Sequence, residues 1–190
     1  MKKKIATYIS VIGHPLLTIP LFVITALFNF NDFKSALSIS LLIVGGIFVP
    51  LTIKTYRGYK KGLYTNFDIS NQTERQSWYS LPLVLLLIVT IVLFVTHQHK
   101  ALKWNALYAF ILLLASQLIN FSIKSSLHVS CNIFLSFLML SINWTMGITF
   151  LAFVVLIAWS RLILKRHTFK EILAGTIIGS IIGLLSLFTI

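Results

Sequence analysis

The chain has 190 residues, of which 57% are hydrophobic and 11% are charged, and its mean hydropathy is +0.92. Charged residues make up about 25% of an average soluble domain, so this composition excludes a water-soluble globule and a disordered chain. Cys131 is the single cysteine, which excludes a disulfide scaffold. The composition therefore predicts an integral membrane protein with one domain over residues 1–190.

Seven apolar stretches approach the length of about 20 residues that a helix needs to cross a bilayer. The first, residues 5–28, follows Met1-Lys-Lys-Lys and is interrupted by His14, Pro15 and Pro20. It is too long for a secretory signal and has no small-residue cleavage site, so we interpret it as a helix. We therefore expect an all-α polytopic bundle, whose other segments are residues 36–53, 78–96, 104–121, 129–142, 144–159 and 172–190.

The fifth and sixth segments are short and adjoin each other. One helix over residues 129–159 would reach roughly 46 Å, which exceeds a hydrocarbon core of about 30 Å. We therefore predict a tight hairpin at Ser141-Ile142-Asn143. In the last segment, Gly175, Gly179 and Gly183 recur every four residues, a spacing that lets another helix approach closely.

The charge is strongly positive, with 16 Lys and Arg against 4 Asp and Glu. In a membrane protein such residues crowd the cytoplasmic loops and contact anionic headgroups, so membrane lipids are the expected partners and nucleic acid is not. Seven crossings place 13 basic residues on the face of the N-terminus and 3 (Lys34, Lys100 and Lys103) on the other. The positive-inside rule predicts that the basic face is cytoplasmic. Few cysteines and no sorting signal agree with a bacterial inner membrane.

Three polar clusters lie on the basic face, at residues 68–75, 124–128 and 160–171. The last two each contain a histidine, His128 and His167. On a helix, His167 and Glu171 share a face, because they are four residues apart. The carboxylate is then placed to hold the imidazole Nδ1–H and to leave Nε2 free. Headgroup anchoring is the alternative for such boundary residues.

Cations accompany both histidines. We expect Arg75, Arg161 and Lys124 to converge on one anion, and the hydroxyl of Ser126 to add a donor. Arginine suits phosphate because its fork donates two parallel hydrogen bonds. Two histidines, several cations and a carboxylate suit phosphoryl transfer without a metal or another cofactor, since this chemistry needs charge neutralisation, a nucleophile and an acid.

The third cluster also resembles a known family. Ser160-Arg161, followed after five residues by His167 and after three more by Glu171, resembles the third signature of the type 2 phosphatidic acid phosphatase superfamily, which includes the vanadium haloperoxidases. The family pattern is S-R-x5-H-x3-D, so Glu171 is a conservative departure. The membrane context and the order of the clusters agree with the lipid phosphatase branch.

The first two signatures match less well. Residues 124–128, KSSLH, resemble the second signature, P-S-G-H, through Ser126 and His128. Of the first signature, K-x6-R-P, only Arg75 carries over, because Asp68 replaces the lysine and Gln76 replaces the proline. The resemblance covers residues 68–190. It implies a six-helix core with the site at one membrane face.

The resemblance also implies roles for residues. His167 attacks phosphorus and becomes a phosphohistidine, Glu171 orients it, and His128 protonates the departing lipid alkoxide. Arg161, Arg75 and Ser126 hold the phosphoryl oxygens, water releases phosphate, and no metal takes part. Our own hypothesis adds Lys124 as the cation that replaces the missing lysine.

These observations predict a lipid phosphate phosphatase acting on a phosphomonoester or diphosphate. Phosphatidic acid, phosphatidylglycerol phosphate and polyprenyl diphosphates are all open as substrates, and the oligomeric state is open too. One alternative is a lipid phosphotransferase on the same scaffold. Another is a non-catalytic transporter or assembly protein whose basic face binds anionic lipid. A haloperoxidase is disfavoured, because those relatives are soluble.

Two further histidine positions allow two interpretations each. His14-Pro15 is interpreted as a kink in the first segment, with a place at the substrate entrance as the alternative. His97 and His99 are interpreted as solvated surface residues, with a metal pair as the alternative.

Overall fold

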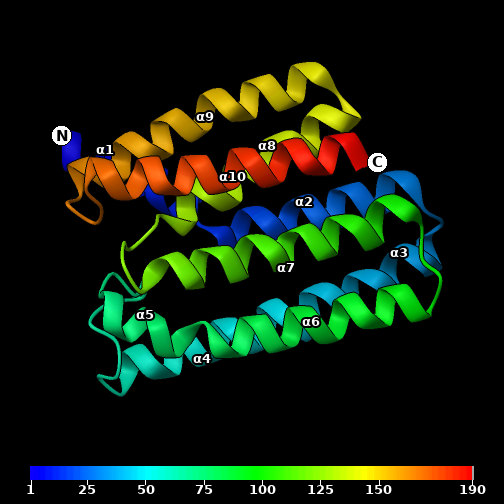
Figure 1. The fold of residues 1–190 in the computed structure, drawn as a ribbon, viewed down its shortest axis with the longest axis horizontal. Coiled ribbons are helices and arrows are strands. Elements are labelled where there is room, and N and C mark those ends of the chain that lie inside the picture. Colours follow the sequence, from blue (N-terminus) through cyan, green and yellow to red (C-terminus); the bar gives the residue numbers. More distant parts are fainter. Residues whose placement is uncertain (190) are drawn as a thin grey trace.

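The computed structural model describes residues 1–189, and in that range it is helical and contains no strand (Figure 1). The elements in chain order are α1 (Lys2–Ile12), α2 (Pro15–Phe30), α3 (Phe33–Ser40), η1 (Leu41–Phe48), α4 (Val49–Lys60), α5 (Gln72–Trp78), α6 (Ser80–Val95), α7 (Lys100–Asn120), α8 (Leu127–Ile142), α9 (Trp144–Ile163) and α10 (Phe169–Thr189). The N-terminal helix is broken into two parts, α1 and α2. The next helix is continuous but has a π-helical middle, so it is described in three parts, α3, η1 and α4.

Five helical stretches are long and apolar enough to cross a membrane, which confirms a helical membrane bundle. They are Phe33–Lys60, Gln72–Val95, Lys100–Asn120, Trp144–Ile163 and Phe169–Thr189. Two elements fall short of this test individually. α1 and α2 count as a sixth span only if the pair, bent by 44°, is taken together, and α8 is apolar but has 16 residues. Seven crossings therefore stay a prediction, and Ile190, which ends the seventh predicted segment, lies outside the described residues.

The predicted hairpin after residue 142 is confirmed. α8 ends at Ile142 and α9 begins at Trp144, so only Asn143 separates them. The side chain of Asn143 accepts a hydrogen bond from the Met146 backbone N–H at 3.0 Å, which caps the start of α9. Asparagine is a preferred residue for this position because its short side chain satisfies a free N–H group.

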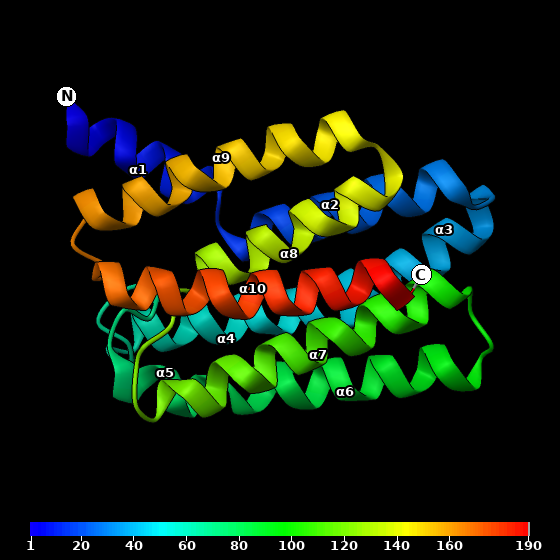
Figure 2. The same cartoon turned by 45° about the horizontal axis from the view of Figure 1, so that its top comes forward.

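α8 is the central helix, and most of its side chains are buried. It packs against α9, α10, α2 and α7, while α1 packs against α9 (Figure 2). The glycines of α10 allow the predicted close approach. A Cβ atom on Gly175 would lie 2.7 Å from the Ser126 carbonyl oxygen, and one on Gly179 would lie 2.6 Å from that of Ser130. The backbones of α8 and α10 therefore lie in direct contact.

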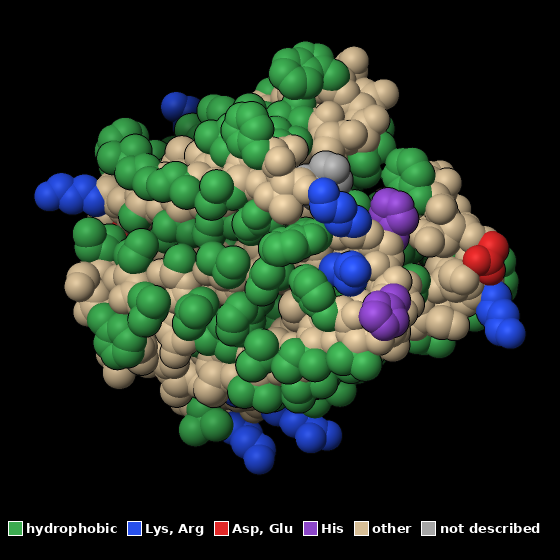
Figure 3. Space-filling model, turned by 45° about the vertical axis from the view of Figure 1, so that its right-hand side comes forward, with side chains coloured by type: hydrophobic (Ala, Val, Ile, Leu, Met, Phe, Trp, Pro, Cys, Tyr) green, Lys and Arg blue, Asp and Glu red, His purple; other side chains and the backbone are tan. Residues whose placement is uncertain are grey.

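The two ends of the bundle differ. The N-terminus and the connections α4–α5, α7–α8 and α9–α10 lie at one end, on the left in Figure 1, and the α8–α9 turn and α10 end lie at the other. All three polar clusters of the sequence belong to the first end. Figure 3 turns the opposite end partly toward the reader: hydrophobic side chains cover the flank of the bundle, and several Lys and His side chains and one acidic side chain appear on the right. We therefore call the first end the polar end and the second the far end.

Candidate functional site at the polar end

The side-chain amine of Lys124 links the three loops that connect helices at the polar end. Lys124, on the α7–α8 connection, donates to the Ser70 carbonyl oxygen at 2.9 Å and to the Arg166 carbonyl oxygen at 3.2 Å. Ser70 belongs to the α4–α5 connection and Arg166 to the α9–α10 connection. The lysine Nζ also lies 3.5 Å from the Glu171 carboxylate. Lys124 thus joins the loops that carry the three clusters, and its role as a phosphate ligand stays a hypothesis.

The start of α10 fixes His167 and Glu171 relative to each other. Thr168 precedes the helix, and its Oγ1 accepts from the Glu171 backbone N–H at 3.4 Å, while the Glu171 carboxylate accepts from the Thr168 N–H at 3.2 Å. This reciprocal pair is a capping box. The same carboxylate oxygen lies 2.8 Å from His167 Nδ1, so the contact expected from the four-residue spacing is confirmed.

The other ring nitrogen of His167 is free to react. A carboxylate only accepts hydrogen bonds, so Nδ1 carries the proton and Nε2 holds a lone pair. Nε2 is buried and has no hydrogen-bond partner among the described residues. Burial and the positive charges of Arg75, Arg161 and Lys124 lower the pKa of His167 well below its ordinary value. The imidazole is therefore neutral at neutral pH, the form that acts as a nucleophile.

Arg161 lies near the end of α9 with its side chain fully buried. Its Nη1 donates to Ser10 Oγ and to Asp68 Oδ2, both at 2.7 Å. Its Nε and Nη2 are buried without a partner in the described part of the chain. Buried charged groups normally satisfy their donors, because leaving them unpaired costs free energy. Two unpartnered donor nitrogens on a buried guanidinium therefore indicate a place for an anion.

Asp68 stands among cations, although it replaces the lysine of the first signature. It accepts from Arg161 and, at 3.2 Å, from Arg166 Nη1, and its other oxygen lies 3.5 Å from His14 Nε2. Burial raises the pKa of this carboxyl, but the contact with His14 and the charges of His128 and Arg161 outweigh burial and hold the pKa below its usual range. Asp68 is therefore an ionised partner that partly neutralises the cationic site.

The two histidines His14 and His128 meet edge to face, with ring centroids 4.7 Å apart. His128 is buried in the first turn of α8, and its Nε2 has no partner among the described residues. His14 caps α2 by accepting from the Leu16 N–H at 3.1 Å, so its Nε2 faces Asp68. The carbonyl oxygen of the preceding residue, Gly13, accepts a hydrogen bond from Asn132 Nδ2 at 2.9 Å. This bond attaches the break between α1 and α2 to α8.

Arg75 and Ser126 complete the set of predicted residues. The buried guanidinium of Arg75 donates to the Ile69 carbonyl oxygen at 3.3 Å and to the Ser125 carbonyl oxygen at 2.7 Å. Ser126 is fully buried, and its N–H donates to the Glu171 carbonyl oxygen at 3.1 Å. The Ser126 hydroxyl has no partner in the described range. All seven predicted site residues therefore lie at the polar end.

Two site residues were missing from the sequence prediction. His14 was interpreted as a kink; the bend does occur there, and His14 also contacts Asp68 and His128. Arg166 was counted only as a basic loop residue, yet it binds Asp68 and the Ser70 hydroxyl. The sequence signal that could have indicated these contacts was Asp68. It is one of only four acidic residues in the chain, and a carboxylate in such a place requires cations close by.

A metal ion fits this end of the bundle less well than an anion. His14, Asp68 and His128 bring one possible ligand atom each within 4.8 Å of one another. However, the Asp68 carboxylate already binds Arg161 and Arg166. Those cations would repel a divalent cation at the same place. The donor set therefore favours a negatively charged ligand.

Unpartnered polar atoms concentrate in this site. Of the 13 buried side-chain nitrogen and oxygen atoms without a partner among the described residues, six belong to it. They are the hydroxyls of Ser125 and Ser126, Nε2 of His128 and of His167, and Nε and Nη2 of Arg161. Native proteins leave few such atoms, and each one calls for an explanation. A bound oxyanion supplies acceptors for the hydroxyl and guanidinium donors.

Comparison of the chain with protein-family models, curated proteins and solved structures finds no match. The resemblance to the type 2 phosphatidic acid phosphatase superfamily therefore stays an expectation from three short signatures. The geometry adds an independent observation, because residues from all three signatures lie together at the polar end of a helical membrane bundle.

Proposed function

We propose that this chain is a membrane-embedded, metal-independent lipid phosphate phosphatase that works through a phosphohistidine. The single observation that carries the proposal is His167. Glu171 holds its Nδ1 at 2.8 Å, while its Nε2 is buried without a partner, close enough to Arg161 for that charge to lower the pKa of His167. An oriented, neutral imidazole beside unpartnered guanidinium donors suits attack on a phosphoryl group.

The first step transfers the phosphoryl group to the protein. Nε2 of His167 forms a bond to phosphorus while the bond from phosphorus to the lipid oxygen breaks. The departing alkoxide takes a proton from His128, and the lipid leaves as an alcohol or, from a diphosphate, as a monophosphate. The Nε and Nη2 donors of Arg161 and the Ser126 hydroxyl bind the phosphoryl oxygens, and Glu171 stabilises the positive charge that develops on the imidazole.

The second step regenerates the histidine. A water molecule gives a proton to the now neutral His128 and attacks phosphorus, and the bond between Nε2 and phosphorus breaks. The products are inorganic phosphate and the protein in its starting protonation state. Arg75 positions the Ser125–Ser126 backbone through its hydrogen bond to the Ser125 carbonyl, so it acts on the reaction through Ser126.

The wider setting is part of the same proposal. The six-helix core that the resemblance implies, seven crossings, and a polar end facing the cytoplasm of a bacterial inner membrane stay proposals. The basic residues at the polar end support the orientation through the positive-inside rule. A reporter fused after residue 190 tests it: seven crossings with a cytoplasmic N-terminus require an external C-terminus, and a cytoplasmic signal would contradict them.

Phosphate release by detergent-purified protein tests the function. Wild type, His167→Ala and the matched control His97→Ala, a histidine at the far end, are assayed with chelator on single-chain and two-chain lipid phosphates. We expect release by wild type and His97→Ala and at least about a thousandfold loss in His167→Ala, because the nucleophile is gone. Equal release by all three proteins would contradict the proposal.

The same assay separates a hydrolase from a transferase. A primary alcohol is added as acceptor, and the products are analysed. A hydrolase continues to release inorganic phosphate as the main product. A transferase, the second candidate, gives the phosphorylated alcohol instead and releases phosphate slowly in its absence.

A further inference from the structure

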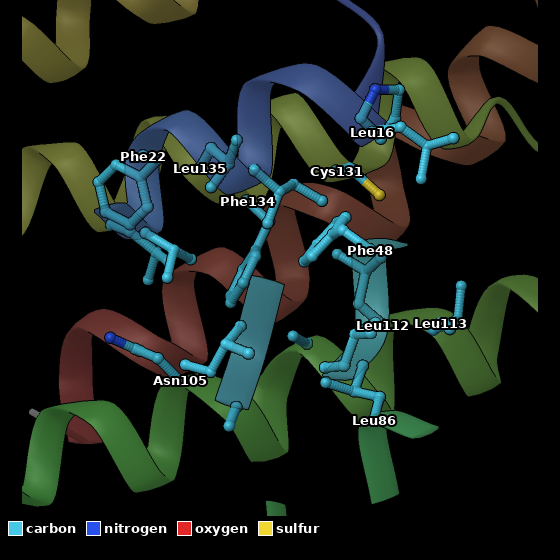
Figure 4. A pocket seen from close by; sticks show the side chains of 18 of the residues that line it. Leu16, Phe22, Phe48, Leu86, Asn105, Leu112, Leu113, Cys131, Phe134 and Leu135 are labelled. Atoms are coloured by element: carbon cyan, nitrogen blue, oxygen red, sulfur yellow. The ribbon is translucent and has the colours of Figure 1, made fainter. Parts of the chain in front are cut away.

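A long cavity of about 650 Å³ lies inside the bundle. Side chains of α2 and α8 border it on one side, and side chains of η1, α6 and α7 border it on the other (Figure 4). Figure 4 shows Phe22, Phe134, Leu112 and Leu86 directed into the same space. A pocket of this size holds one small-molecule ligand, for which the usual range is about 300–1,000 Å³.

The cavity is apolar along its length and differs at its two ends. At the polar end it is lined by His14, Asp68, Arg75 and His128, which belong to the site described above. Its far end is lined by residues of the α6–α7 connection and the last turn of α8, among them His99 and Ser141. The cavity thus connects the proposed phosphate site to the opposite side of the bundle.

The length of the cavity constrains its ligand. Its lining residues accompany α2 from Pro15 to Phe30 and α8 from Leu127 to Ile142, which is about 24 Å for 16 residues of helix. This exceeds one leaflet, about half of a 30 Å hydrocarbon core. An apolar ligand that fills the cavity is therefore long enough to pass the membrane midplane.

We propose that this cavity binds the tail of the substrate, and that this tail is a hydrocarbon chain longer than one leaflet. This inference rests on the proposed phosphatase function and narrows it to long-chain lipid phosphates or diphosphates. The tail enters the cavity beside His128, the proposed proton donor to the leaving oxygen, and extends past the membrane midplane between α2 and α7.

A chain-length series tests the inference through activity. Monoalkyl phosphates from hexyl to docosyl are assayed with wild type, Ala109→Trp and Ala152→Trp. Ala109 lines the middle of the cavity on α7, whereas Ala152 is exposed on α9. We expect the ratio of kcat/KM for docosyl over hexyl phosphate to fall about tenfold in Ala109→Trp, because the indole fills the path of the tail. The ratio in Ala152→Trp stays at the wild-type value.

A photolabel tests the inference without turnover. The probe is octadecyl phosphate with a diazirine at the last carbon, applied to wild type and to His167→Ala. We expect labelled peptides from the far halves of α7 and α2, around Leu102 and Ala26, which line the cavity. Excess unlabelled octadecyl phosphate should abolish this labelling, and hexyl phosphate should compete at least about tenfold less well, because its tail buries less apolar surface in the cavity.

The outcomes separate this inference from the proposed function. Labelling only at lipid-facing positions such as Val155 or Ile181, or an unchanged docosyl-to-hexyl ratio in Ala109→Trp, would overturn the tail site even if phosphate is released. Far-end labelling in a protein that releases no phosphate would support the tail site and contradict the phosphatase. The thermal stability of Ala109→Trp shows whether that variant folds, and the photolabel decides if it does not.

Discussion

The two halves of this molecule pack in different ways. In the half formed by α8, α9 and α10, backbones touch: a Cβ on Gly175 or Gly179 would lie within 2.7 Å of a carbonyl oxygen of α8. In the half formed by α3, η1, α4, α6 and α7, apolar side chains form the contacts. There, a Cβ on Gly45 would meet nothing within 4 Å.

The site and the cavity use these halves differently. His128, Arg161, His167 and Glu171 come from the closely packed half, whereas the cavity lies between the halves, bordered by α8 on one side and by η1, α6 and α7 on the other. Phosphoryl transfer requires reacting atoms within a few tenths of an ångström of the productive geometry, which fixed backbones provide. A hydrocarbon tail makes no directional contacts, so a boundary of apolar side chains is enough for it. The difference teaches that the closely packed backbones hold the reacting groups, while packing through side chains leaves room for a ligand.

Arg161→Ala should have the largest effect. It removes two unpartnered donor nitrogens from the site and leaves the partly buried carboxylate of Asp68 without its closest cation. Loss of one such donor typically costs about a hundred- to a thousandfold in kcat, so we expect at least that loss. Phosphate release measures it. Arg161→Lys should recover little activity, because lysine lacks the planar fork, and full activity in Arg161→Lys would contradict bidentate binding.

Gly175→Val tests the close packing itself. The new side chain meets the Ser126 backbone, so α10 must move away from α8 and carry His167 with it. We expect a loss of about 1–3 kcal/mol of stability and a fall in activity. Thermal unfolding in detergent measures the first and phosphate release the second. The matched control Gly45→Val lies where there is space, and it should change both quantities much less.

The positions of these contacts show what the sequence predicts and what it does not. The four-residue spacing predicts the contact of Glu171 with His167, although His167 lies ahead of α10 and the contact forms across the capping box rather than along a helix face. The length limit of a span places the hairpin at Asn143, and both are local rules. The contact of His14 with Asp68 joins residues 54 positions apart, and no local pattern encodes it. The cavity is equally invisible in the sequence, because its lining residues look like any lipid-facing side chains.

Asp68→Asn tests how the ion pair between the α4–α5 connection and Arg161 of α9 affects phosphate binding. Asp68 offsets the positive charge of Arg161 and Arg166 beside the proposed phosphate site, so removing its negative charge should strengthen binding of inorganic phosphate. We expect the inhibition constant of phosphate to fall on the order of tenfold. The control is Asp32→Asn, which changes a carboxylate that caps α3 at the far end. Weaker inhibition by phosphate would mean that Asp68 positions the arginines.

The smallest effect concerns the stability at acidic pH. The pKa of His167 is lowered on folding, so below its ordinary value of 6.5 the unfolded chain binds a proton that the folded protein does not. Stability is therefore greatest above that pH and falls as the pH drops below it, by at most about 1.4 kcal/mol per pH unit. Thermal unfolding between neutral pH and pH 5 should show a shallower decline in His167→Gln. An identical decline would contradict a buried neutral imidazole.

The most direct test of the central claim is to trap the phosphorylated protein. His128→Ala removes the group that activates water, so the intermediate should accumulate when the protein meets a radiolabelled nitrophenyl phosphate, whose leaving group departs without the proton of His128. The account predicts an acid-labile, base-stable label on His167 that is absent from His167→Ala. Release of phosphate by the wild type with no label on His167 in the trapped variant would contradict the account.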